Sequence, residues 1–283
     1  MEKLIHICTA AHQKGYLIGK TDFANGFNSM SRQSMLVTHS ALFPEAVDIF
    51  NFFYGCRAPC FVFDQDNNIL TFFSEEGSRQ GCAAGSEAFC LGLTPVLQLL
   101  QHKYPEFELR AVVDDIVPIV PAPHTGSKED WMLLFSRYAD FLHELKDLSL
   151  ALCGLHLNLD KGALLLPPSA PDPTAEILAK FDPSFCFCRD GLIIVGGPVG
   201  TDLFVNEFMR QKMLQAVVKL QAIKQLGMRE VRAAHRLLVA CASKLPLFLA
   251  SVVPPSLSLP HLEWFDSQLR ATFFHVVGDP DLA

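Results

Sequence analysis

Hydrophobic and polar residues change their spacing along the chain, and this pattern predicts both strands and helices up to about residue 200. Runs rich in β-branched and aromatic residues, which are typical of strands, cover 15–22, 59–64, 69–74, 108–120 and 154–167. The polar stretch DQDNN at 64–68 lies between two such runs and predicts a hairpin. The run GLHLNLDKGALLLP at 154–167 predicts a strand, a turn and a second strand.

Other segments have apolar residues at helical spacing, three or four positions apart. These predicted helices are 2–13, 31–43, 44–55, 82–101 and 129–152. Ser29 or Ser31 is a candidate cap of the second helix, and Thr125 or Ser127 of the last. Gly154 is placed to end the last helix.

The C-terminal part of the chain has a different organisation. After a Pro-rich loop at 167–174 and a short helix, FCFC at 185–188 and GLIIVGG at 191–197 predict two strands around an Arg-Asp-Gly turn. From Asp202 onward the pattern is helical, with breaks at Gly227, Pro246 and Pro254–Pro255. Strands and helices that mix without regular alternation, followed by helices alone, predict an α+β domain with a helical appendage.

Composition excludes several classes of protein. Half of the 283 residues are hydrophobic, which excludes a disordered chain. The apolar runs are interrupted before the ~18 residues that a membrane span needs, the nearest being 245–260 with its four prolines. The first residues lack the apolar core of a signal peptide, and nine cysteines form no paired framework. We therefore expect an intracellular protein, nuclear or cytoplasmic, without a membrane partner.

Charge is unevenly distributed. The net charge of −7 argues against a general nucleic-acid binder. Residues 205–244, however, hold only two acidic residues, and their net charge is +6. The eight basic residues are Arg210, Lys212, Lys219, Lys224, Arg229, Arg232, Arg236 and Lys244. Such a segment fits either a polyanionic ligand bound at one place or a solvated helix face.

Adjacent carboxylates suggest a candidate metal site. Asp114 and Asp115 lie between two Val- and Ile-rich runs, so they are predicted at the turn of a hairpin, and Asp22 follows another strand. Neighbouring carboxylates repel each other unless a cation such as Mg²⁺ binds them. Carboxylates at strand ends are suited to two-metal phosphoryl transfer. The alternative is that each acid is an ordinary turn or cap residue.

Five segments in this order strengthen the metal interpretation. They are DFANGFNS (22–29), GSRQG (77–81), VVDD (112–115), GLHLNLDK (154–161) and GGPVG (196–200). Together they resemble the ordered palm motifs of reverse transcriptases, with the greatest similarity to those of LINE-type (non-LTR) retrotransposons. The resemblance implies a polymerase-type palm over 1–200, in which helices pack on an antiparallel sheet, and a helical thumb-like region over 201–283. It implies an RNA-directed DNA polymerase, a nucleotidyltransferase that adds dNTPs to a primer on an RNA or DNA template.

The resemblance also implies residue roles. Asp22, Asp114 and Asp115 would bind Mg²⁺, with Mn²⁺ as a substitute, and Lys161 would neutralise or protonate the departing pyrophosphate. The nucleotide-binding residues implied are Phe23, Phe27, Gln80, Gly81 and Asn158, with Phe27 excluding a 2′-hydroxyl. The nucleic-acid contacts implied are Gly197, Arg210, Lys212, Lys219 and Lys224. From local sequence alone, Phe27 could equally be a core residue and Lys161 a solvated turn residue.

The sequence also departs from the family pattern. Val112 stands where an aromatic residue usually precedes the acid pair, and residues 82–85 lack the usual proline. Only 21 residues precede Asp22, which leaves no room for the upstream fingers. We therefore expect a piece of a longer polyprotein, whose missing N-terminal part would be a partner. Two alternatives stay open: an inactive retroelement remnant that at most binds nucleic acid, and a phosphotransferase of unrelated fold.

Overall fold

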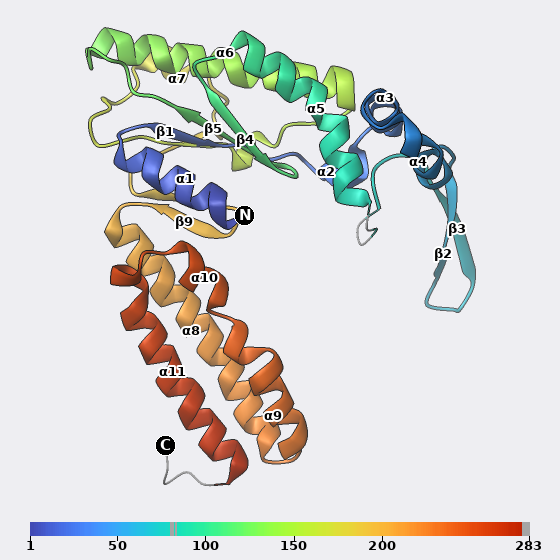
Figure 1. Cartoon of the computed structure of the whole chain (residues 1–283), viewed down its shortest axis with the longest axis vertical. Helices are drawn as coiled ribbons and strands as arrows, with labels where there is room; N and C mark the ends of the chain where they lie inside the picture. The colour runs from blue at the N-terminus through green and yellow to red at the C-terminus, as the bar shows by residue number, and fades with distance from the viewer. Residues whose placement is uncertain (80–81, 83, 279–283) are drawn as a thin grey trace. The chain divides into compact units, whose positions relative to one another are not determined.

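The chain forms two compact units in a computed structural model that describes residues 1–79, 82 and 84–278. The sheet unit is Lys14–Phe187, and the helical unit combines Met1–Gln13 with Cys188–Ala283. This division differs from the expected boundary at residue 200. The N-terminal helix belongs with the C-terminal helices, and the last strands before residue 200 belong with them too (Figure 1).

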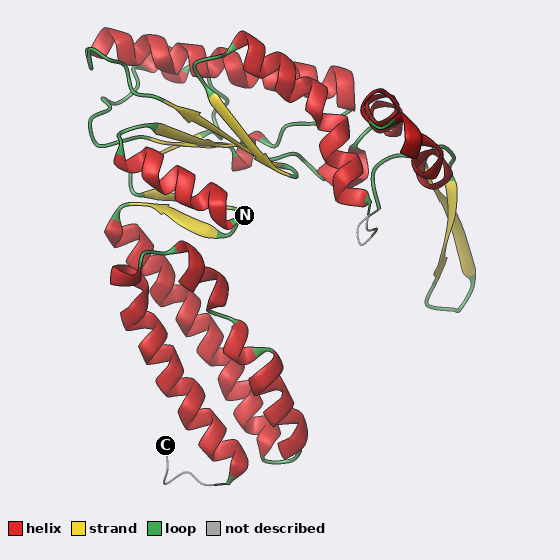
Figure 2. Cartoon of the chain, viewed as in Figure 1, coloured by secondary structure: helices red, strands yellow, loops and turns green. Residues whose placement is uncertain are grey.

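A five-stranded sheet, in the order β4-β5-β1-β6-β7, is the centre of the sheet unit. Its strands are β1 (Leu17–Lys20), β4 (Glu108–Val112), β5 (Asp115–Val120), β6 (Ala163–Leu165) and β7 (Cys186–Cys188). The helices of the unit are α2 (Gly26–Ser29), α3 (Arg32–Leu42), α4 (Val47–Tyr54), α5 (Gly85–Lys103), α6 (Lys128–Cys153) and α7 (Ala175–Leu178), with 3-10 turns η1 (Pro44–Ala46) and η2 (Leu159–Lys161). The mixture of antiparallel strands and helices confirms the predicted α+β class (Figure 2).

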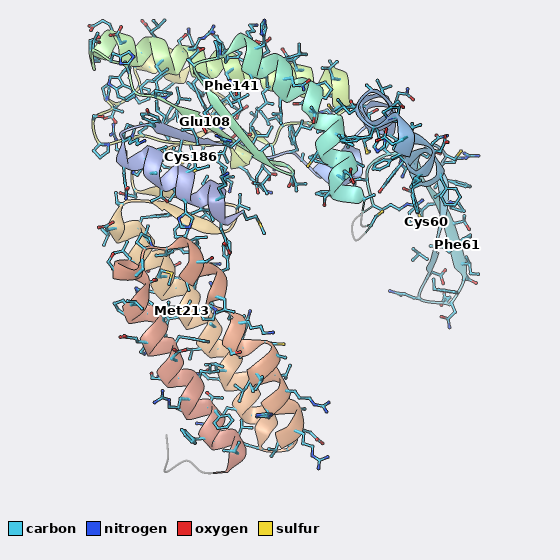
Figure 3. All side chains as sticks on the ribbon, in the orientation of Figure 1. Cys60, Phe61, Glu108, Phe141, Cys186 and Met213 are labelled. Carbon is cyan, nitrogen blue, oxygen red and sulfur yellow. The ribbon has the colours of Figure 1, made fainter. Side chains whose placement is uncertain are left out.

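The core of the sheet unit lies between the sheet and α5 and α6 (Figure 1). Phe89 on α5 and Phe141 on α6 are both fully buried, and Phe141 lies between α6 and the sheet (Figure 3). The boundaries of α6 agree with its sequence signals. Ser127 accepts a hydrogen bond from the Asp130 amide, and Gly154 ends the helix in the left-handed conformation. Ser31 caps α3 in the same way, through the amide of Ser34.

A separate two-stranded hairpin, β2 (Ala58–Phe63) with β3 (Ile69–Ser74), confirms the hairpin predicted around residues 64–68. Its apolar side chains are unusually exposed. Phe61 is 63% exposed and Phe63 66%, and Phe61 lies on the hairpin well away from the five-stranded sheet (Figure 3). An isolated two-stranded hairpin is marginally stable, and exposed apolar strands promote association.

We expect the substitutions Phe61→Ser and Phe63→Ser together to increase the monodisperse fraction in sedimentation velocity. Both rings are already largely exposed, so their loss is expected to lower the free energy of unfolding by less than about 1 kcal/mol. Leu133→Ser replaces an exposed apolar residue of α6, outside the hairpin. This variant is the control and should not change association. Equal association of the double variant and the control would contradict the prediction.

The helical unit packs long helices side by side (Figure 1). Its helices are α1 (Glu2–Gln13), α8 (Asp202–Gly227), α9 (Val231–Ala240), η3 (Ala242–Lys244), α10 (Leu247–Val252) and α11 (Pro255–Val277), and its hairpin joins β8 (Gly191–Ile194) to β9 (Gly197–Gly200). The predicted breaks at Gly227, Pro246 and Pro254–Pro255 are confirmed. Among the described residues, Val231–Val252 is the single helical stretch that is long and apolar enough to cross a membrane, by length and composition only. In the structure it is divided among α9, η3 and α10.

The predicted pairing around the Arg189–Gly191 turn is wrong. β7 belongs to the five-stranded sheet, whereas β8 pairs with β9. The two-residue turn lies instead at Val195 and Gly196, which both have positive φ. Two positive φ angles suit a tight hairpin whose twist matches its strands, although Val is an uncommon residue there.

Candidate functional site

The register of three antiparallel strands brings the sequence-predicted residues together. Thr21 pairs with Ile116 through backbone hydrogen bonds of 3.0 and 3.4 Å, so the next residues outward, Asp22 and Asp115, lie opposite each other. On the other side of β1, Lys20 pairs with Ala163. Just before β6 the chain forms the η2 turn, whose backbone bonds to Asp22 through Asn158, and the side chain of Lys161 in this turn reaches Asp22.

The turn of the β4–β5 hairpin supplies the third carboxylate. Val112 pairs with Asp115, and Val113 and Asp114 form the turn. Val113 has a φ of 58°, which is a strained conformation for a β-branched residue. The strain lies directly beside the acid pair, and the side chain of Val113 packs against the core. The packing of Val113 therefore stabilises the turn that holds Asp114 and Asp115.

These side chains line one pocket of about 370 Å³. The lining residues are Asp22, Phe23, Asn25, Gly26, Phe27, Asp114, Asp115 and Lys161. Six of them were predicted from the sequence as site residues. Asn25 and Gly26 were not singled out, although both belong to the DFANGFNS segment. Asn25 has a φ of 53° and its side-chain oxygen accepts a hydrogen bond from Asn28 at 2.7 Å, which shapes the turn beside Asp22.

An ion pair crosses the pocket. Lys161 Nζ donates to Asp22 Oδ2 at 2.7 Å, with the lysine side chain 62% exposed and the aspartate 14%. The hydrogen bond to Asp22 and the charge of Asp22 raise the pKa of Lys161, and Asp114 and Asp115 raise it further. Lys161 is therefore protonated at neutral pH and faces a group of carboxylates.

Burial raises the pKa of Asp115, and the negative charges of Asp114 and Asp22 add to the effect, while Lys20 and Lys161 oppose it. Between its unfolded and folded pKa values, Asp115 binds more protons in the folded chain. The folded chain is therefore stabilised as the pH falls through that interval, and ionised Asp115 is destabilising at neutral pH.

We expect Asp115→Asn to raise the free energy of unfolding at pH 7 by up to about 1 kcal/mol, because the amide removes this repulsion. The gain should shrink as the pH approaches 4, where the wild-type carboxyl becomes protonated. Urea denaturation at several pH values measures the effect, with exposed Asp147→Asn on α6 as control. A gain that is constant with pH would contradict the assignment to Asp115 ionisation.

The two predicted aromatic residues have different environments. Phe23 is 3% exposed and belongs to the hydrophobic core, so most of its ring packs inside the unit. Phe27 is partly buried and stacks on Phe89, with ring centroids 5.1 Å apart. The stacking fixes the orientation of the Phe27 ring at the pocket wall. Phe27 thus packs against the core and also lines the pocket.

Asn158 is linked to the site by its backbone. Its amide donates to the carbonyl of Asp22 at 2.8 Å, and the amide of Ala24 donates to His156 O at 2.8 Å. An isolated bridge between Phe23 and Leu157 joins the same two segments. Asn158 therefore fixes the position of Asp22, and its side chain is not among those that line the pocket.

Gln80 and Gly81 lie outside the described residues, but the segment that leads to them is anchored. The amides of Gly77 and Ser78 donate to the carbonyls of Met30 and Phe27 at 2.9 and 2.7 Å. Arg32 on α3, which is 6% exposed, donates to the carbonyls of Gly77, Ser74 and Glu76 and to the Ser74 hydroxyl. Sequence reasoning missed Arg32, although a basic residue on the buried face of a helix was an available signal.

The basic residues of α8 are exposed but do not share one face. Lys212 and Lys219 are seven residues apart and lie on one side of the helix, whereas Arg210 and Lys224, fourteen apart, lie on another. Arg210 is also paired with Glu207 at 2.7 Å, and the hydrogen bonds from Arg210 and Gln211 lower the pKa of Glu207 to about 2. Lys212 lies over the Phe208 ring at 5.3 Å.

Gly197 is buried in β9. A Cβ atom at this position would lie 2.5 Å from Ile5 Cδ1 of α1. A larger residue at this position would therefore require the Ile5 side chain of α1 to move.

The pocket has the donor atoms that a hard cation prefers. Three carboxylates line it, and oxygen ligands are those that Mg²⁺ and Mn²⁺ take in proteins. Within the part of the chain that the structure describes, no three carboxylate, histidine or cysteine side chains are already arranged to hold a metal ion. Asp22 is instead engaged by Lys161. The donor atoms present thus fit such a cation by their chemistry, and Lys161 is paired with one of the three carboxylates.

Comparison with known proteins finds similarity to solved structures only. No protein-family model and no curated protein matches the chain. Apo telomerase from Candida tropicalis is similar in structure, with a TM-score of 0.51 and 9% identity over 98% of this chain and 51% of that chain. Telomerase from Candida albicans in complex with a TWJ fragment of telomeric RNA has a TM-score of 0.49 and 13% identity, over 98% of this chain and 49% of that one.

The chain thus has a fold similar to that of the Candida tropicalis telomerase, a reverse-transcriptase-like fold. The chain spans about half the length of the telomerase chains it matches. At 9% identity the likeness concerns the fold alone, and it agrees with the fold implied by the motif order in the sequence. The LINE-type origin, the intracellular location and the residue roles stay predictions.

Proposed function

We propose that the chain is the palm and thumb-like part of an RNA-directed DNA polymerase from a non-LTR retroelement. One observation carries the proposal: Asp22, the adjacent pair Asp114–Asp115, and Lys161 come from distant parts of the sequence and line one pocket on a reverse-transcriptase-like fold. The motif order in the sequence supports the retroelement origin.

In the proposed reaction, the primer 3′-hydroxyl forms a bond to the α-phosphorus of a dNTP and loses its proton, while the bond to pyrophosphate breaks. Asp22, Asp114 and Asp115 would hold Mg²⁺ or Mn²⁺. The bound cations would supply activation of the attacking oxygen and stabilisation of the leaving group. Lys161 would face the departing phosphates, and the fixed Phe27 ring would limit the space beside the sugar.

Primer extension on a primed RNA template, with dNTPs and Mg²⁺ or Mn²⁺, tests the proposal. Extension by the wild-type chain that is lost in Asp114→Ala/Asp115→Ala is the expected result. Extension that persists in the double variant would place the activity elsewhere or in a contaminant. No extension by either protein, when both are folded, would contradict activity of this chain alone. The same assay with a separate N-terminal segment added then tests the predicted polyprotein partner.

A second candidate function is nucleic-acid binding without chemistry. It is favoured by the basic segment 205–244, whose eight basic side chains are all exposed. Binding of a primed duplex that weakens steeply between 50 and 200 mM salt, without incorporation, would support it. Charge-reversal of Lys212 and Lys219, which share a face of α8, would then be expected to weaken binding more than reversal of Arg210, which is paired with Glu207.

A further inference from the structure

The ion pair between Lys161 and Asp22 joins residues that are 139 positions apart. Its geometry is tight, at 2.7 Å, and its two partners differ in exposure. The Asp22 carboxylate is largely shielded from water, at 14% exposed, so it depends on a nearby positive charge. The Lys161 side chain is 62% exposed and can leave the pair by rotating its own stem.

The backbone holds Lys161 beside Asp22 whether or not the pair is made. Hydrogen bonds of 2.8 Å from Asn158 N to Asp22 O and from Ala24 N to His156 O tie the two segments together. The η2 turn, with Lys161 N donating to Asn158 O at 3.3 Å, then fixes the lysine backbone. Loss of the ion pair therefore requires no movement of the main chain.

The pair lies where a cation would have to bind. Asp22 is opposite Asp115, and both line the same pocket as Asp114. A divalent cation shared by these carboxylates would be repelled by an ammonium group that remained on Asp22. The same carboxylates, without a cation, would repel one another if the ammonium group left.

We propose that Lys161 is a tethered counter-ion that occupies Asp22 when no divalent cation is bound and is displaced when one binds. The inference rests on the proposed function, because it takes the same three carboxylates as the cation ligands. It adds that Lys161 sets the affinity of the site for its cation, and that cation binding frees the ammonium group to face an anionic ligand in the pocket.

Titration of the full chain with Mn²⁺ alone, followed by the electron paramagnetic resonance of free Mn²⁺, tests the proposal. Lys161→Met should bind Mn²⁺ about tenfold more tightly than wild type, because the competing charge is gone. Lys161→Arg, which keeps the charge, should bind no more tightly than wild type. Lys146→Met, at an exposed lysine of α6, is the matched control for loss of a positive charge from the same unit.

Further variants distinguish the counter-ion role of Lys161 from the proposed cation site itself. If Lys161→Met matches wild type while Asp114→Asn/Asp115→Asn binds Mn²⁺ much more weakly, the counter-ion role is wrong and the cation site stands. If neither wild type nor Lys161→Met binds Mn²⁺, the cation site itself is wrong, and the counter-ion role with it. A metal-free measurement is acylation of Lys161 followed by mass spectrometry. Asp22→Asn should accelerate it several-fold, and an unchanged rate would overturn the ion pair.

Discussion

Replacing Asp22 with Asn is expected to reduce primer extension by about a thousandfold or more. The change keeps the shape of the side chain and removes its charge from a pocket that already holds Asp114 and Asp115. A cation bound there would lose an anionic ligand, and a thousandfold loss of rate corresponds to about 4 kcal/mol of transition-state stabilisation. Single-turnover incorporation of one dNTP in saturating Mg²⁺ measures the effect.

Asp160→Asn is the matched control for that experiment. Asp160 is exposed, precedes Lys161 and is absent from the pocket lining, so its loss should change incorporation by no more than a few-fold. Circular dichroism melting should show both variants folded. If Asp22→Asn retains activity while Asp114→Ala/Asp115→Ala does not, Asp22 is excluded as a cation ligand, and its role is limited to binding Lys161.

The sequence was sufficient to predict the acids and much of what surrounds them. Asp114 and Asp115 stand between two runs rich in Val and Ile, and two such runs separated by a short polar stretch favour a hairpin. The positions of helices were equally accessible, because caps such as Ser127 and breaks such as Gly154 are local signals. The fold class followed from the order of these elements. Convergence of Asp22 with the acid pair came from the family resemblance rather than from local pattern.

Long-range partners could not be predicted in the same way. The pairing of Asp22 with Lys161 depends on the register of β1 against β6 and on the bridge between Phe23 and Leu157, which no local pattern specifies. Short strands carry even less information. β7 and β8 have only three and four residues. The predicted pairing of these two strands was wrong, because so few alternating positions do not specify which strand is the neighbour.

Arg32 shows a further limit of sequence reasoning. Its helix presents Met35, Thr38 and His39 on the same buried face, so an arginine there contradicts the amphipathic pattern. The structure explains it by acceptors that come from residues 74–77, more than forty positions away. Burial lowers the pKa of its guanidinium, although an arginine stays charged. The side chain binds the base of the β2–β3 hairpin to α3.

The largest stability effect that we expect is therefore at this position: Arg32→Met should lower the free energy of unfolding by about 3 kcal/mol. Methionine keeps the apolar stem but removes every donor, which leaves the carbonyls of Ser74, Glu76 and Gly77 without the partner that the guanidinium supplies. Each buried acceptor that loses its partner costs about 1–3 kcal/mol, and partial access of water reduces the total. Urea denaturation monitored by circular dichroism measures the change.

Arg57→Met separates the loss of buried donors from the loss of an arginine at the same hairpin. Arg57 pairs with Glu75 at 3.6 Å with both side chains about 60% exposed, and its guanidinium lies over the Phe73 ring. Exposed pairs of this kind contribute less than about 1 kcal/mol. Equal destabilisation by the two substitutions would show that the Arg32 hydrogen bonds add nothing beyond charge. A much larger loss for Arg32→Met would establish that one buried side chain anchors the hairpin and, with it, the segment that precedes Gln80 and Gly81.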